Sequence, residues 1–263
     1  MSYLVKSLEA SPARLSQAQQ TQVIQAHYEY VCKEIASFIK GKRSARGLII
    51  NGPKGGGKTS LVVHTVKELR HACHVINGTI TAPVLWEHLY THARNPNQTL
   101  IIDDTDVVFN DIEMSDILKA ALDGQGKTIN YGKANSAYLR ERAIPTEFKC
   151  MGRVIFISNM NMDPEALHKR HRATLVPIKD RCEYLKVGVS TQWNAVAMWV
   201  FYQHNMISAL EASTLTASQK RDLMLFVVEH AWSDDRWTFR TIQKAISRVQ
   251  QGGRWRDHVL LGL

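Results

Sequence analysis

Cysteine is scarce in this sequence and is not arranged in pairs. Four cysteines are scattered over 263 residues, and no C-x-x-C spacing occurs. This argues against a zinc ribbon or a disulfide framework and fits a reducing compartment. Cys73 lies between His71 and His74, but no second ligand pair accompanies them. We therefore expect a solvated helix end at this point rather than a metal site.

Long hydrophobic runs are also absent. The most apolar run, residues 195–202, is far too short to span a bilayer, and the N-terminus shows no signal-peptide pattern. The sequence carries no nuclease or protease signature and no internal repeat. We expect a soluble, intracellular protein of the cytoplasm without a membrane partner.

Negative charge is in deficit. Lys and Arg number 33 against 24 Asp and Glu, which gives a formal net charge of +9 and a pI near 9.4. This balance points to a polyanionic partner, usually nucleic acid, although a membrane surface or an acidic protein would also suit it. The length allows one large domain or a core with a smaller appendage.

Glycine, in contrast, is concentrated in one stretch. An apolar run at residues 47–50 precedes residues 52–59, which fit G-x-x-x-x-G-K-[ST] at every fixed position, and helical spacing follows. Strand, glycine loop and helix together favour a phosphate site over an ordinary turn. The residues predicted to bind the nucleotide are Gly52, Pro53, Lys54, Gly55, Gly56, Gly57, Lys58, Thr59 and Ser60. Lys58 would reach the β- and γ-phosphates of ATP, and Thr59 would ligate Mg²⁺.

Further strands and helices alternate after this loop. Residues 74–78 and 99–104 are predicted strands, and residues 84–93 form a predicted helix between them. Such alternation predicts a parallel sheet with its ligand at the carboxyl ends of the strands. Asp103 would then hold the magnesium through water and Asp104 would orient or deprotonate the attacking water. Capping of a strand end is the alternative for this pair.

A second polar strand end is predicted farther along. After a helix at residues 114–122, residues 128–131 alternate like a strand, and a return through residues 143–145 would make a β-hairpin. Residues 152–159 form a predicted core strand, at whose tip Asn159 would hold the hydrolytic water beside the γ-phosphate. The alternative for Asn159 is a simple turn.

The remaining segments are helical in pattern. Residues 1–46 are predicted as an N-terminal helical segment or linker, residues 47–189 as the α/β core and residues 190–263 as a small all-helical lid domain. The apolar positions that recur at helical intervals in the first segment are Val23, Ala26, Tyr30, Ile35 and Phe38. The lid helices are expected near residues 193–210, 218–232 and 238–249.

Taken in order, these motifs resemble the AAA+ ATPases over roughly residues 45–250. The resemblance makes Asn159 the sensor 1 residue and implies a P-loop NTPase of the AAA+ type, with a parallel sheet sandwiched by helices and followed by a helical lid. Asp180-Arg181-Cys182 resembles the clamp-loader segment that carries the arginine finger. Residues 239–242 resemble the lid motif in which Arg240 would be the sensor 2 arginine.

The same resemblance implies oligomerisation. In these families the nucleotide lies at a subunit boundary, and an arginine of one subunit completes the site of its neighbour, with a large effect on rate. Arg181 is the first choice for this role, and Arg172 and Arg170 are competitors. The implied assembly is a homo-oligomer, a hexameric ring or spiral.

A narrower resemblance is to the superfamily 3 viral helicases. It rests on residues 120–124, on Lys133 and on the strand that ends in Ser158-Asn159. It implies that Lys133, together with Lys127 and Tyr131, contacts nucleic-acid phosphates at a hairpin. An exposed turn lysine is the alternative for Lys133.

Three functions are therefore considered. The first is a DNA-directed motor, helicase or helicase loader in replication or recombination, with DNA favoured over RNA and a phage or mobile-element origin. The second is a protein-remodelling ATPase, for which the region around Trp86 offers an aromatic residue but no glycine partner. The third is an ATP-dependent switch that regulates a partner protein.

Overall fold

The computed structural model of the chain describes residues 17–103, 106–123, 126–132, 136–160, 162, 165, 169–188 and 191–262. Contacts divide it into two compact units. One contains Glu34–Gly52 and Thr65–Lys186, and the other contains Pro53–His64, Val187–Leu263 and the N-terminal segment as far as Lys33. The predicted three-part division at residues 46 and 189 stays a prediction.

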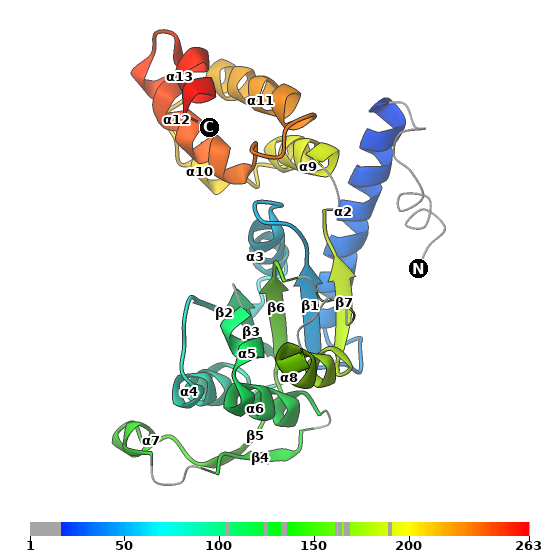
Figure 1. Cartoon of the computed structure of the whole chain (residues 1–263), viewed down its shortest axis with the longest axis vertical. Helices are drawn as coiled ribbons and strands as arrows, with labels where there is room; N and C mark the ends of the chain where they lie inside the picture. The colour runs from blue at the N-terminus through cyan, green and yellow to red at the C-terminus, as the bar shows by residue number, and fades with distance from the viewer. Residues whose placement is uncertain are drawn as a thin grey trace. The chain divides into compact units, whose positions relative to one another are not determined.

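A five-stranded parallel sheet organises the first unit (Figure 1). Its strands are β1 (Gly47–Asn51), β2 (Ala72–Asn77), β3 (Gln98–Asp103), β6 (Arg153–Ser158) and β7 (Cys182–Lys186). Their order is β2-β3-β6-β1-β7. The three central strands are apolar and almost completely buried, as expected where helices cover both faces of a parallel sheet. The predicted parallel α/β sheet is confirmed.

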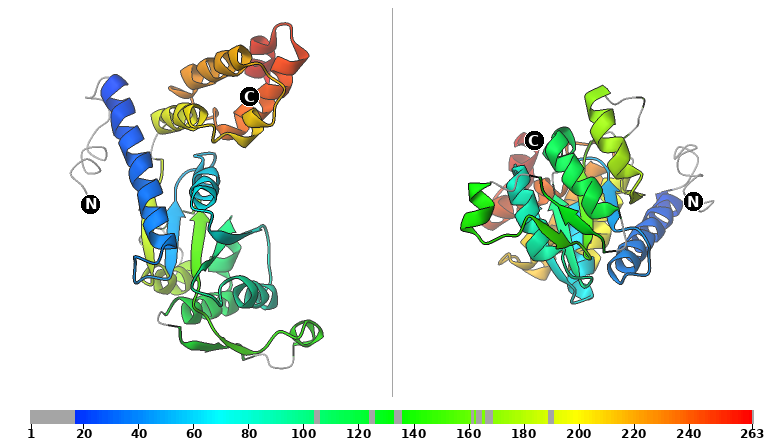
Figure 2. Two further views of the ribbon diagram at one scale, coloured as in Figure 1. Left: turned by 180° about the vertical axis from the view of Figure 1, so that it is seen from behind. Right: turned by 90° about the horizontal axis from the view of Figure 1, so that it is seen from below.

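Helices of this unit pack on the sheet and on one another. They are α4 (Ala82–His92), α5 (Asp106–Asn110), α6 (Ile112–Leu122), α7 (Ala137–Glu141) and α8 (Lys169–Lys179). Seen from below, α4, α6 and α8 lie side by side on one face of the sheet (Figure 2). Asp111 starts α6 by accepting a 2.8 Å hydrogen bond from the backbone N–H of Met114. None of the helices in these described ranges combines the length and apolar character that crossing a bilayer requires.

Two local predictions need correction. Residues 71–74 are not a helix end, because β2 already begins at Ala72. The return strand of the predicted hairpin is β5 (Glu147–Lys149), which pairs antiparallel with β4 (Thr128–Asn130), rather than residues 143–145. The short helix α7 lies between the two strands, so the segment is a longer insertion than a tight hairpin.

The second unit is helical, as the sequence predicts for its C-terminal part. It contains α9 (Thr191–Gln203), α10 (Ser208–Glu211), α11 (Ala217–Ala231), α12 (Phe239–Gln251) and α13 (Trp255–Leu261). Thr216 and Thr238 begin α11 and α12 with capping boxes. Trp237, just before α12, is 2 % exposed and anchors the core of this helical group.

Helix α2 (Gln17–Ile39) precedes β1, and α3 (Lys58–Glu68) follows the glycine-rich loop. The apolar stripe of α2 is shifted from the predicted one. Tyr30, predicted on that stripe, is 47 % exposed, whereas Tyr28 is 3 % exposed. Tyr28 packs against Trp193 and Phe201 of α9, with ring centroids 5.5 and 5.8 Å apart. The shift brings a tyrosine hydroxyl to the glycine-rich loop.

Candidate nucleotide site

The glycine-rich loop turns directly from β1 into α3. Gly55 and Gly57 have φ angles of +74° and +75°, a region that glycine adopts without the penalty of a Cβ atom. Lys58 is the first residue of α3 and is 6 % exposed, and its Nζ donates to the carbonyl of Pro53 over 2.7 Å. The loop therefore places a lysine, a threonine hydroxyl and the amide end of a helix together, which is an arrangement suited to phosphate.

The start of α12 lies against this loop. A Cβ on Gly55 would come within 2.6 Å of Thr238, and one on Gly57 within 2.8 Å of Phe239. Phe239 in turn packs on Phe201, with ring centroids 4.9 Å apart. Arg240, the predicted sensor 2 residue, follows Phe239 directly and is exposed. The lid helix that carries Arg240 thus begins at the phosphate loop.

Two residues at the loop escaped the sequence analysis. The hydroxyl of Tyr28 donates to the carbonyl of Gly56 over 3.4 Å, and burial raises the pKa of that hydroxyl far above its usual value. Asn194 of α9 is 6 % exposed, its Oδ1 lies 3.5 Å from the position of a Cβ on Gly56, and no described group donates to it. A buried acceptor without a donor is uncommon.

Two neighbouring strands end in polar residues at the carboxyl edge of the sheet. Asp103 ends β3 and is paired with Ile157 of β6, and Asn159 directly follows β6. Because parallel strands end at the same edge, both residues lie where the chain leaves β1 for the glycine-rich loop. Asp104 falls outside the described residues.

Asn51 and Tyr184 fix the exit of β6. Asn51, 8 % exposed, donates through Nδ2 to the carbonyls of Ser158 and Met160 over 3.3 and 2.8 Å. Tyr184 donates to Asn51 Oδ1 over 2.9 Å, and burial raises the pKa of Tyr184, which keeps the phenol protonated. These bonds bracket Asn159 on both sides. An asparagine closing an apolar strand is the only sequence signal for this role.

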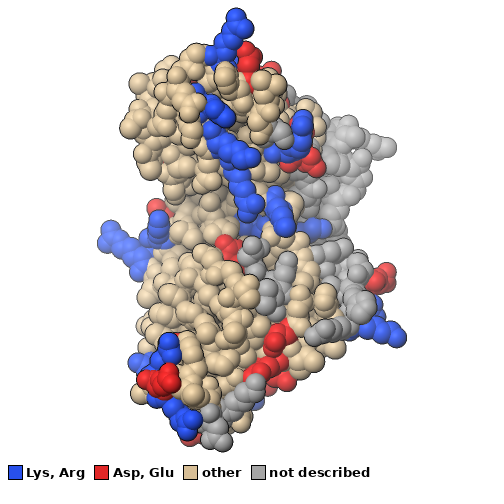
Figure 3. Space-filling view, turned by 60° about the vertical axis from the view of Figure 1, so that its left-hand side comes forward, with Lys and Arg blue, Asp and Glu red and all other residues tan. Residues whose placement is uncertain are grey.

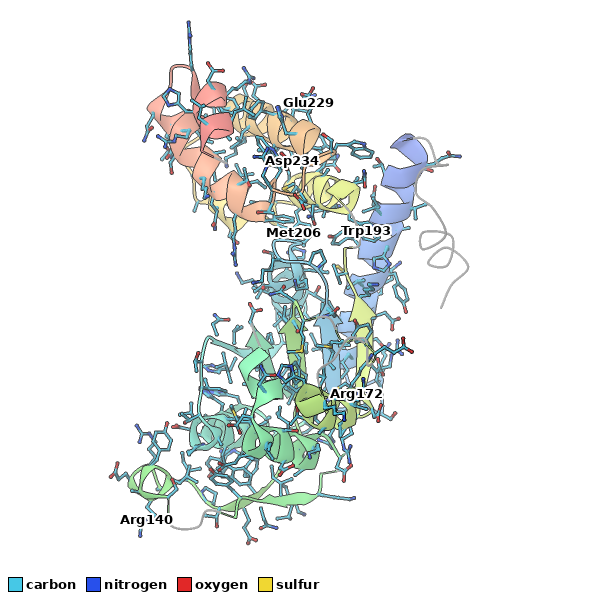
Figure 4. The ribbon with its side chains drawn as sticks, in the orientation of Figure 1. Arg140, Arg172, Trp193, Met206, Glu229 and Asp234 are labelled. Carbon is cyan, nitrogen blue, oxygen red and sulfur yellow. The ribbon has the colours of Figure 1, made fainter. Side chains whose placement is uncertain are left out.

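The preferred finger candidate, Arg181, is not brought to this edge. Arg181 precedes β7, whose first residue pairs with Gly47, so it lies at the amino edge of the sheet. Its Nε donates to Asp123 over 3.0 Å and its Nη1 to the carbonyl of Pro177 over 2.8 Å. Arg172 is exposed on α8 (Figure 4). Arg170 lies on the same helix, but its side chain is outside the described set.

Burial argues against the nucleic-acid contact predicted for Tyr131. Tyr131 is 5 % exposed, stacks on Trp86 with ring centroids 5.4 Å apart, and donates its hydroxyl to Glu113. Trp86 is itself fully buried and donates through Nε1 to the carbonyl of Pro145 over 2.8 Å. Both aromatic residues therefore hold the β4–β5 segment in place. Lys127 is exposed just before β4, and Lys133 lies outside the described residues.

A basic surface runs along the exposed face of α12. Residues 239–256 contain five cations and no carboxylate, and Arg240, Lys244 and Arg248 recur at four-residue intervals on the exposed side. A hollow beside them, between α12 and α13, is lined by Lys244, Arg248 and His258, among others. Figure 3 shows Lys and Arg side chains in a row on the helical unit.

Comparison with known proteins gives one curated relative and several solved structures. No protein-family model matches the chain. An uncharacterised 36.7 kDa protein of the nrdC-mobD intergenic region in Enterobacteria phage T4 is 36% identical over 152 residues, which cover 56% of this chain and 46% of that protein. The chain therefore spans about half the length of this relative.

Among solved structures, NtrX from Brucella abortus in complex with ADP matches with a TM-score of 0.50 and 13% identity, over 88% of this chain and 50% of that chain. A RuvB point mutant from Thermotoga maritima matches with a TM-score of 0.47 and 11% identity, over 88% of this chain and 62% of that chain. The likeness to NtrX supports a parallel α/β fold with a helical C-terminal region. The chain has the α/β fold of the AAA+ P-loop NTPases, a parallel sheet flanked by helices and followed by a helical lid.

Proposed function

We propose that this protein is an oligomeric, ATP-hydrolysing AAA+ enzyme that acts on nucleic acid. The observation that carries the ATPase part is the glycine-rich loop with Gly55 and Gly57 in the left-handed region and a buried Lys58 opening α3. A loop of this shape offers several backbone N–H groups to one phosphate chain, and the helix terminus adds positive potential.

The site residues divide the work of hydrolysis. Lys58 binds the β- and γ-phosphates, while Thr59 and Asp103 hold Mg²⁺, the aspartate through a water molecule. Asp104 orients or deprotonates the attacking water, and Asn159 positions that water from the end of β6. Mg²⁺ would neutralise charge on the phosphate oxygens during transfer.

The lid completes the nucleotide site in this proposal. Arg240 senses the phosphates from the start of α12, because the residue before it already packs on Gly57. Tyr28 and Asn194 border the loop from α2 and α9.

An arginine from a second subunit would complete each site. Arg181 is the preferred candidate because it lies at the amino edge of the sheet, away from the carboxyl edge of its own subunit. Its bonds to Asp123 and Pro177 hold the guanidinium in a defined position. Arg172 and Arg170 of α8 remain competitors. A homo-oligomer, with a hexameric ring or spiral as the preferred form, follows from this role.

The nucleic-acid part of the proposal rests on the basic face of α12. With Arg240 assigned to the nucleotide, Lys244, Arg248 and Arg254 remain exposed, and no described carboxylate lies at ion-pair distance from them. Cations at successive helical turns suit a phosphodiester backbone, whose binding depends on counterion release. Similarity to a phage T4 protein supports a phage origin. The superfamily 3 resemblance, with Lys133 as a contact, stays a separate prediction.

The protein-remodelling alternative loses its residue-level support. Trp86, the aromatic residue that this region offers, is fully buried and hydrogen-bonded. A regulatory switch has no specific feature in its favour. Both alternatives depend on protein partners and are distinguished by the same assay as the main proposal.

The test is ATP turnover with and without single-stranded DNA, duplex DNA and RNA at a series of salt concentrations. The K244Q/R248Q double variant should retain basal turnover but lose its stimulation by nucleic acid. The slope of log K for nucleic-acid binding against log salt concentration should become shallower by about one for each lost phosphate contact. The K67Q/R221Q double variant removes two exposed cations elsewhere and should behave like the parent protein.

Lys133→Ala in the same assay separates the two candidate surfaces. If nucleic acid no longer stimulates Lys133→Ala but still stimulates K244Q/R248Q, the nucleic-acid site belongs to the β4–β5 segment instead. Turnover that ignores every nucleic acid would contradict this part of the proposal and direct the search to a protein partner.

A further inference from the structure

Three histidines meet at the rim of the sheet unit, outside the nucleotide site. His74 lies on β2, and His88 and His92 lie one turn apart on α4. One ring nitrogen of each lies within 4.8 Å of the others. The rings of His74 and His92 are stacked, with centroids 3.8 Å apart and planes inclined by 8°, and His88 lies 5.1 Å from His74.

The hydrophobic core fixes this meeting point. On β2, His74 shares a face with Ile76, which is buried in the same cluster as Leu85 and Leu89 of α4. His88 and His92 lie beside that apolar stripe at helical spacing. Because β2 is the edge strand of the sheet order, the three rings lie at the margin of the core. All three are half-buried, so an ion can reach them.

The donor atoms of the cluster are imidazole nitrogens, which are common metal ligands. Glu87, next to His88 in sequence, is occupied elsewhere, since it accepts a hydrogen bond from Tyr138 and lies 3.8 Å from Arg142. The cluster is therefore an all-nitrogen donor set.

We propose that His74, His88 and His92 form a binding site for a divalent transition-metal ion of the zinc class. Three imidazoles with a water molecule in the fourth position match a tetrahedral zinc site. With Zn–N bonds of about 2.0–2.1 Å, such an ion holds its nitrogens roughly 3.4 Å apart, so modest side-chain rotations would close the cluster. Mg²⁺ prefers oxygen ligands and belongs to the nucleotide site instead.

The bound ion would link two elements that are otherwise joined by apolar contacts. It would fasten the edge strand β2 to α4, the helix that also carries Trp86 under the β4–β5 segment. Anything that binds only the folded state stabilises it by mass action. The site does not depend on nucleotide binding, so the two proposals can fail separately.

The experiment is metal titration of the full chain after chelation and removal of the chelator. Zn²⁺ should bind with one equivalent per chain and raise the melting temperature, and Co²⁺ should give the visible absorption of a four-coordinate nitrogen site. His88→Gln and His92→Gln should each weaken this binding by more than about 100-fold, beyond the 10–100-fold loss typical of an outer-shell partner. ATP turnover should be unchanged.

Two controls keep the result decisive. His204→Gln, an exposed histidine of the helical unit, should bind metal like the parent protein. His92→Phe keeps an aromatic ring for stacking but removes the ligand nitrogen, so it should remain folded and lose the metal. Absence of uptake by the parent protein, or uptake unaffected by all three variants, would show that the histidines are a packing cluster only.

Discussion

The two edges of the five-stranded sheet differ in what they present. At the carboxyl edge, Asn51 donates to the carbonyls of Ser158 and Met160 on either side of Asn159, and Asp103 ends the neighbouring strand β3. At the amino edge, Arg181 is fixed by Asp123 and Pro177. In Figure 1 the β4–β5 pair lies on that side, away from the arrowheads of β1, β6 and β7.

The difference shows how one subunit could serve two sites. In the proposed mechanism the carboxyl edge serves the nucleotide, whereas the amino edge offers a positioned cation with no phosphate site of its own among the described residues. A cation that acts on a neighbouring subunit must be held in one position at the surface. Hydrogen bonds to a carboxylate and a carbonyl restrict the guanidinium in this way. The following predictions test this division of roles.

The largest effect is expected from Arg181→Ala. Loss of a true arginine finger should lower turnover by about 10³–10⁵-fold while nucleotide affinity is retained. Measured kcat and the affinity for a fluorescent ATP analogue would separate these two effects. Mixing Arg181→Ala subunits with Lys58→Ala subunits should restore partial turnover, since some boundaries then join an intact loop to an intact finger.

Arg172→Ala and Arg170→Ala are the comparison variants, and Asp123→Asn is the anchor control. If Arg181 is the finger, the two α8 variants should keep ATP turnover. Asp123→Asn should lose less turnover than Arg181→Ala, because the bond from Arg181 to the carbonyl of Pro177 remains. Full turnover of Arg181→Ala would transfer the role to α8 or remove it altogether.

A smaller effect is expected at the carboxyl edge from Asn51→Ala. The change removes both bonds that bracket Asn159, and a displacement of about 1 Å at a catalytic group costs on the order of 10²-fold in rate. Steady-state kcat should fall while nucleotide affinity changes little. Tyr184→Phe removes only the bond to Asn51 and should be milder; an unchanged kcat in both variants would separate Asn51 from the hydrolytic step.

The smallest effect on turnover is expected from Tyr131→Phe beside β4. It removes the hydroxyl that donates to Glu113 and should lower the free energy of unfolding by about 1.5–3 kcal/mol, as for a hydrogen bond to a charged group. Denaturant unfolding measures this change. Nucleic-acid stimulation should be unaffected, because the ring is buried against Trp86; loss of stimulation at unchanged stability would revive the contact that burial argues against.

The fold and the loop could be read from the sequence because their signals are local. The strand at residues 47–50, the glycine pattern after it and the helical lid each depend on neighbouring residues, and the structure contains all three elements. The buried face of a helix is predicted less reliably. The apolar stripe of α2 was misplaced, and Tyr28 rather than Tyr30 is buried, because a helix tolerates apolar residues on more than one face.

The rest of the site depends on residues that only the fold brings together. Asn51 with Tyr184 and Asn194 with Gly56 are each separated by more than a hundred residues. The histidines at positions 74, 88 and 92 are closer in sequence, but their meeting requires β2 to pack on α4. Tyr131 looked exposed in an alternating polar segment, and tertiary packing against Trp86 overrode that pattern.

The most direct test of the central claim is Mg²⁺-dependent ATP hydrolysis by the parent protein and by Lys58→Ala, at equal protein concentration and with the fold of each verified. The parent protein should bind and hydrolyse ATP, and the variant should lose at least about 10²–10³-fold of this activity, as expected when a preorganised donor to the phosphates is removed. Equal turnover by the two proteins, or no nucleotide binding by the parent protein, would contradict the assignment of the glycine-rich loop as the catalytic phosphate site.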